Sequence, residues 1–181
     1  MVLDKVHRRY VGLIVFVSCF SCAFSQDHQL LTKKESKFVK RVFSEEWIAE
    51  ALILPDQNTA FSGLLLEEDR VHIIRQQDLV LGYLLSTRAM GRFDPFDYLL
   101  AFAPDFSVLD LSITVYRSAH GAAICQKKWL SQFEAYAGED LTYGKDIDAI
   151  SGATISATSM VKDVQRCYQI MISLKEEALI Q

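Results

Sequence analysis

The sequence is short of the residues that build metal centres and disulfide scaffolds. Its 181 residues include four cysteines and four histidines, and two of the cysteines lie within the first 25 residues. The remaining pair, Cys125 and Cys167, is too small a set for a disulfide-stapled scaffold, and the sequence leaves open whether the two pair. The three histidines beyond residue 25 show no metal-ligand spacing with these cysteines. We therefore expect no metal site.

Positive charge is also scarce. The formal net charge is −4, and the opening ten residues are basic, so the rest of the chain is more acidic than the whole. Nucleic-acid binding depends on Lys and Arg that neutralise phosphates. We therefore expect no nucleic-acid partner.

A long apolar run is missing as well. VGLIVFVSCFSCAF at residues 11–24 follows the basic stretch MVLDKVHRRY, and it is shorter than the about 20 apolar residues of a membrane span. Small residues at Ala23 and Ser25 precede Gln26, which is the layout of a secretory signal peptide over residues 1–25. Two alternatives stay open: an uncleaved anchor, or lipidation of Cys19 or Cys22. We expect an exported protein, periplasmic or membrane-anchored on the extracytoplasmic face, with residues 26–181 as one domain.

The rest of the chain predicts helices at both ends of a strand-rich middle. Helical spacing of apolar residues covers residues 32–51, and Pro55 and Asn58 break it. SGLLLEE, RVHIIRQ and LVLGYLLST suggest strands, and residues 96–118 suggest a hairpin that turns at 103–105. CQKKWLSQFEAYAG returns to helical spacing with Gly138 as a stop, and SMVKDVQRCYQIMISLKEEALI carries one apolar stripe. This order predicts an α+β domain, an antiparallel sheet with packed helices.

Hydroxyl and small residues gather just before that last stripe, in DIDAISGATISATS. A helix start offers unpaired N–H groups and the positive end of the helix dipole, which favours an anion. Gly152 permits a tight bend, and Ser156 is a candidate N-cap. The stretch has no G-x-S-x-G elbow, no phosphate-binding G-x-x-x-x-G-K-[ST] and no local histidine. Composition alone favours an ordinary helix start, with Asp148 as a solvated carboxylate.

The heptapeptide Asp148 to Thr154, D-A-I-S-G-A-T, resembles the D-x-x-[ST]-G-A-[TS] flavinylation motif of the covalent FMN-binding domain family. The family includes the flavinylated subunits of the sodium-pumping NADH:quinone oxidoreductase and of the Rnf complex. The likeness implies that Thr154 carries FMN through a phosphoester bond made by a separate flavin transferase, which recognises Asp148. It extends over roughly residues 60–175. The pump subunits have a Glu-Thr-Pro-Gly segment where this chain reads Arg117-Ser-Ala-His-Gly121, so only the glycine is kept.

The resemblance implies an electron carrier with covalent FMN and no catalytic residue of its own, passing electrons between membrane and extracytoplasmic redox partners. Two other functions stay open: a flavin-dependent reductase with its own substrate, and an exported binding or adaptor module without flavin. The residues implied in cofactor binding are Thr154, Asp148, Ser151, Gly152, Ala153, Ser156, Gly121 and His120.

Overall fold

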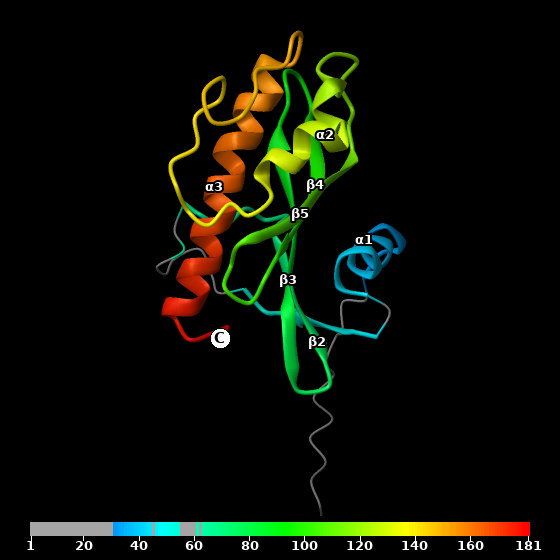
Figure 1. Cartoon of the computed structure of the whole chain (residues 1–181), viewed down its shortest axis with the longest axis vertical. Coiled ribbons are helices and arrows are strands. Elements are labelled where there is room, and N and C mark those ends of the chain that lie inside the picture. Colours follow the sequence, from blue (N-terminus) through cyan, green and yellow to red (C-terminus); the bar gives the residue numbers. More distant parts are fainter. Residues whose placement is uncertain (1–30, 45, 55–60, 62) are drawn as a thin grey trace, which may run out of the picture.

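Five antiparallel strands form one sheet. The computed structural model describes residues 31–44, 46–54, 61 and 63–181. The strands are β1 (Ile48–Leu52), β2 (Arg70–Gln76), β3 (Leu79–Met90), β4 (Pro95–Phe102) and β5 (Val108–Val115), and their order in the sheet follows their order in the chain. Each strand therefore pairs with its neighbour in sequence (Figure 1). The predicted α+β class is confirmed.

The two faces of the sheet bear different helices. Successive side chains of a strand point to opposite faces, so Tyr83 and Leu85 of β3 join one hydrophobic cluster and Leu84 joins the other. The first cluster contains the buried side chains of α3 (Thr154–Glu176), and the second contains those of α1 (Lys33–Phe43). Figure 1 shows α3, in orange and red, and α1, in blue, on opposite sides of the sheet. The result is a three-layer domain with its larger core beneath α3.

The first helix is shorter than the sequence predicted. α1 begins with a capping box in which Thr32 and Glu35 bond each other's backbone N–H, and it ends at Phe43. Ser44 has a φ of 80°, which breaks the helix before the edge strand β1 begins at Ile48. The expectation of a helix to residue 51 is therefore wrong beyond Phe43. Trp47, which extended the helical spacing, packs instead on the cluster under α1.

Two further expectations need correction. SGLLLEE forms no strand over its described residues 63–68; these lie in turns, where Leu65 is buried in the larger core. The helical stretch predicted from Cys125 to Gly138 is instead a series of short turns: η1 (Ala122–Cys125) ends where it should begin, and α2 (Lys127–Leu130) and η2 (Ser131–Phe133) follow and end before Gly138. Its apolar residues are spaced for a helix, but only short turns form: the backbone is extended at Gln126 and again at Glu134, while Trp129 and Phe133 pack against each other in the core. The predicted breaks at Pro55 and Asn58 lie outside the described residues.

The other predicted elements are confirmed. RVHIIRQ is β2, and residues 103–107 join β4 to β5, where the Ala103 N–H donates to the Ser107 carbonyl at 2.8 Å. α3 carries the apolar stripe, but it begins at Thr154, ahead of Ser159. Cys125 is exposed, Cys167 is buried, and both are free thiols. No helix in the described part of the chain is both long and apolar enough to cross a membrane.

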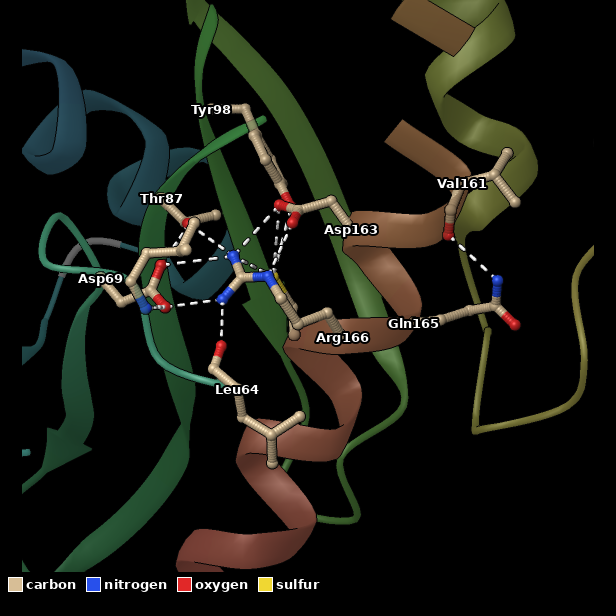
Figure 2. A network of polar contacts seen from close by, with 10 residues as sticks. Leu64, Asp69, Thr87, Tyr98, Val161, Asp163, Gln165 and Arg166 are labelled. Atoms are coloured by element: carbon tan, nitrogen blue, oxygen red, sulfur yellow. Dashed lines mark hydrogen bonds and ion pairs between the residues drawn. The ribbon is translucent and has the colours of Figure 1, made fainter. Parts of the chain in front are cut away.

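A polar network fastens the middle of α3 to the sheet (Figure 2). Arg166 donates to Asp69 at 2.7 Å, to Asp163 at 2.6 Å and to the Leu64 carbonyl at 2.8 Å. Tyr98 of β4 donates to Asp163 at 2.6 Å. Burial would lower the pKa of Arg166, but hydrogen bonds to Asp163 and Asp69 raise it well above its ordinary value. The guanidinium therefore stays charged and joins α3, β3 and the segment before β2.

Burial keeps the thiol beside this network protonated. Cys167 lies 3.2 Å from the Tyr98 hydroxyl and has no exposed surface. Its burial, together with the negative charge of Asp163, raises the pKa of the thiol. A buried thiol with a raised pKa is unreactive. We therefore assign Cys167 a packing role.

Candidate functional site

The loop that leads into α3 is held by side chains from the surrounding elements. The Asp148 N–H donates to the Gln132 side chain, and its carbonyl accepts from the Trp129 indole, both at 2.8 Å. The Ile150 N–H donates to the Tyr143 hydroxyl at 2.8 Å. Trp129 is thus a core residue whose ring nitrogen holds the motif in place. The loop reaches α3 with its backbone fixed.

Asp148 and Ser151 are exposed on this fixed backbone. The backbone N–H and carbonyl of Asp148 are both hydrogen-bonded within the protein, whereas the residue is exposed to solvent. A carboxylate presented in this way is accessible to another protein. Neither residue lines either of the two surface hollows beside Thr154, which are described below.

Gly152 turns the chain into the helix. Its φ is +73°, a conformation that favours glycine, and a Cβ there would meet no atom within 4 Å. A glycine at this position is therefore favoured by its backbone conformation and not by a lack of space for a side chain. Ala153 follows as the N-cap, buried, with its N–H donating to the Ile150 carbonyl at 3.2 Å.

Thr154 is the first residue of α3, and it is exposed. The N-cap residue, Ala153, has no side-chain oxygen to accept from the first N–H groups, and the first turn of the helix contains no acidic residue. α1, by contrast, has a complete capping box. The first N–H groups of a 23-residue helix are therefore left for water or a ligand, next to an accessible hydroxyl.

Ser156 is buried inside the first turn of α3 and is not the N-cap that the sequence suggested. Its Oγ lies 3.0 Å from the Tyr116 hydroxyl, which donates its own proton to the His120 carbonyl at 2.7 Å. Since a phenol has one proton, Ser156 is the donor to Tyr116. This chain of hydrogen bonds ties the loop after β5 to the start of α3.

Two glycines allow the neighbouring loops to approach Ser156. A Cβ on Gly121 would lie 2.5 Å from the Tyr116 hydroxyl and 3.2 Å from the Ser156 Oγ, and Gly121 has a φ of +84°. A Cβ on Gly91, in the turn between β3 and β4, would lie 2.5 Å from the Asp94 carbonyl and 3.5 Å from the Ser156 Oγ. Both turns therefore meet the start of α3 at one end of the molecule (Figure 1).

Two hollows flank Thr154. The smaller, of about 200 Å³, is lined by the loop after β5, the β3–β4 turn and the helix start. The larger, of about 450 Å³, is lined by Met90 and Gly91 at the end of β3 and by residues of α3 as far as Lys162. Thr154 and Ile155 belong to both. The residues that line the smaller hollow are Arg92, His120, Gly121, Gly152, Ala153, Thr154, Ile155 and Ser156.

The family of this segment follows from comparison with known proteins. Residues 91–169 match the model of the FMN-binding domain family. Over this segment the chain is similar to FMN-binding domains. The matched residues run from the β3–β4 turn through the motif into α3, so they contain both sides of the smaller hollow. No curated protein matches the chain.

The smaller hollow suits an anionic group. Its titratable lining residues are Arg92 and His120, and no carboxylate is among them. The N–H groups of the helix start add partial positive charge. The lining therefore fits the phosphate of FMN.

The sequence led to six of these eight lining residues and missed Arg92 and Ile155. It also missed Gly91 and Tyr116, which shape the hollow without carrying ligand chemistry. A glycine between two strand-like runs signals the β3–β4 turn. No local pattern indicates that this turn folds beside Thr154.

Proposed function

We propose that this FMN-binding domain is an extracytoplasmic electron carrier whose FMN is joined through its phosphate to the Thr154 hydroxyl. The position of Thr154 carries the proposal: it completes the D-A-I-S-G-A-T motif, it is exposed, and it opens a helix without a side-chain cap among the described residues. The resemblance to flavinylated ion-pump subunits supports covalent attachment, and the family match supports FMN as the cofactor.

The described residues supply binding and support. Thr154 provides the oxygen that carries the phosphate, and the helix start stabilises the remaining negative charge. His120 and Gly121 close the smaller hollow from the loop after β5, and Ser156 with Tyr116 fixes that loop. FMN, when bound, supplies the electron transfer. A covalent bond retains the cofactor outside the cell without a deep pocket.

A separate flavin transferase would make the bond. The lining of the smaller hollow offers Thr154 no carboxylate base, and we assign the domain the role of acceptor in this reaction. Asp148 is suited to recognition because its backbone is fixed from two sides while the residue faces solvent. Ser151 and Ala149 near it are also exposed, so a transferase can reach three of the first four residues of the motif.

Export and membrane partners belong to the same proposal. They are supported by the basic and apolar composition of residues 1–25, which lie outside the described residues. A domain in this compartment would exchange electrons with a membrane donor and an extracytoplasmic acceptor.

A reductase with its own substrate is the second candidate, and the larger hollow favours it. With about 450 Å³, this hollow has the size of a small-molecule site and adjoins Thr154. A small molecule that reoxidises the reduced, FMN-loaded protein mole for mole, and whose binding depends on Met90 and Lys162, would support the reductase over the carrier.

The deciding experiment is the intact mass of the denatured protein after co-expression with a flavin transferase. We expect a gain of one FMN less one water, on the peptide that contains Thr154. Thr154→Ala should show no gain, whereas Thr158→Ala, one turn further along α3, should be loaded like the wild type. A wild-type chain that stays unmodified while a known family member is loaded would contradict the proposal and favour the flavin-free module.

A further inference from the structure

We propose that Arg92 is the counter-cation of the FMN phosphate, binding its oxygens beside Thr154. The inference rests on the proposed function, because it assigns a partner to the group that Thr154 would carry. It starts from the distribution of charge pairs among the arginines of the structure.

Arg92 differs from the other described arginines in having no carboxylate partner among the residues that the structure describes. These residues include seven arginines, and six of them form ion pairs with Asp or Glu. Within the described residues, Arg92 contacts an aromatic ring instead: its guanidinium carbon lies 5.1 Å from the centroid of the Phe93 ring. The six paired arginines are Arg41, Arg70, Arg75, Arg88, Arg117 and Arg166.

The fold places this arginine at the attachment residue. Arg92 is in the β3–β4 turn, which the Gly91 N–H closes by donating to the Asp94 carbonyl at 3.0 Å. Gly91 is buried, and it packs so near the Ser156 Oγ that the turn is fixed relative to α3. As a result, Arg92 from the β3–β4 turn and Thr154 from the start of α3 line the same hollow.

The chemistry of the hollow selects phosphate as the partner. Arginine presents a planar fork of donors that binds two phosphate oxygens at once. The lining contains no carboxylate that would compete for it. Stacking on Phe93 restricts the side chain without neutralising its charge. The helix start and Arg92 together would surround the phosphodiester with positive potential from two sides.

Lys162 provides a matched control. It is also exposed and lines a hollow with Thr154, but that hollow is the larger one, and Lys162 does not line the smaller hollow with Arg92. Lys162→Gln removes the same charge as Arg92→Gln at a comparable place on the surface. Any effect of net charge alone will appear in both variants, whereas a direct phosphate contact will appear only in Arg92→Gln.

The test compares the full chain with Arg92→Gln, Arg92→Lys and Lys162→Gln, each incubated with the flavin transferase. The first measurement is the loading rate by intact mass at limiting flavin concentration. The second is the phosphorus-31 resonance of each fully loaded protein, with and without added NaCl. We expect Arg92→Gln to load about tenfold more slowly, as the loss of a charge-assisted hydrogen bond implies. Its resonance should shift and become sensitive to salt, Arg92→Lys should be intermediate, and Lys162→Gln should match the wild type.

Each other outcome decides a different point. A resonance in Arg92→Gln that overlays the wild type would overturn the inference, even if loading is slower, because Arg92 would then be contacting the transferase. Equal shifts in Arg92→Gln and Lys162→Gln would also overturn it. A wild type that cannot be loaded would refute the proposed function and the inference with it. Thermal unfolding of each variant verifies the fold, and Arg92→Lys keeps the charge if Arg92→Gln is unstable.

Discussion

The first turn of α3 and the middle of the same helix differ in how their polar groups are satisfied. In the middle, Arg166 is bonded to two carboxylates, a hydroxyl and a carbonyl, and it joins three segments of the chain. In the first turn, Thr154 is exposed, and the described residues provide neither a side-chain cap nor a carboxylate partner for nearby Arg92. The helix is therefore fastened at one place and left open to a ligand at another. Variants in the middle should lower stability, and variants at the start should lower FMN loading.

The largest effect on stability is expected from Arg166→Met. It would leave Asp69, whose side chain has no exposed surface, without its cation. Breaking one partner of a buried ion pair costs about 3–5 kcal/mol. Urea denaturation should show this loss in the free energy of unfolding, while the protein that remains folded in the cold should still accept FMN on Thr154.

Arg75→Met is the control for that experiment. Arg75 pairs with Glu50 across β1 and β2, where both side chains are accessible to solvent. Exposed pairs contribute about 0–1 kcal/mol. Equal destabilisation by the two substitutions would show that the network in Figure 2 does not fasten α3.

An intermediate effect is expected from Gly121→Ala. The new Cβ would lie 2.5 Å from the Tyr116 hydroxyl at a φ of +84°, so the loop must move away from the start of α3. Holding a residue other than glycine in such a conformation costs about 1–3 kcal/mol. We expect a lower melting temperature by calorimetry and slower loading of FMN by intact mass, because the smaller hollow loses one wall.

Gly144→Ala separates the backbone effect from the crowding. Gly144 has the same φ of +84°, but a Cβ at this position would meet no atom within 4 Å. It should lose stability to a smaller extent and load FMN at the wild-type rate. Equal loading rates in the two variants would mean that the loop after β5 does not shape the flavin site.

The sequence predicted the parts of this molecule whose signals are local. A run of β-branched residues identified β2, and an apolar stripe identified α3. The spacing of apolar residues predicts too long a first helix because Trp47 continues it, whereas the helix breaks at Ser44, a residue of positive φ with no glycine or proline to mark the break. The edge strand β1 is short and half-exposed, so it lacks the apolar run of an inner strand.

The site divides in the same way. The motif from Asp148 to Thr154 is contiguous, so it was recognisable before the fold was known. Arg92 and Gly91 precede the motif by a hairpin and three short helices, and only the antiparallel order of β3, β4 and β5 brings their turn to the start of α3. Such a contact depends on register, which local spacing does not encode.

The smallest effect on stability, with a large effect on loading, is expected from Asp148→Asn. The residue is exposed and its internal hydrogen bonds come from the backbone, so the free energy of unfolding should change by less than about 0.5 kcal/mol. Loading by the transferase should slow, since the carboxylate is lost while the Thr154 hydroxyl remains. Asp146→Asn is the control in the same loop: its side chain accepts from the Thr142 N–H at 2.9 Å, and an amide oxygen can keep that bond. Equal loading rates in the two variants, measured by intact mass, would show that the transferase recognises the hydroxyl end of the motif and does not require Asp148.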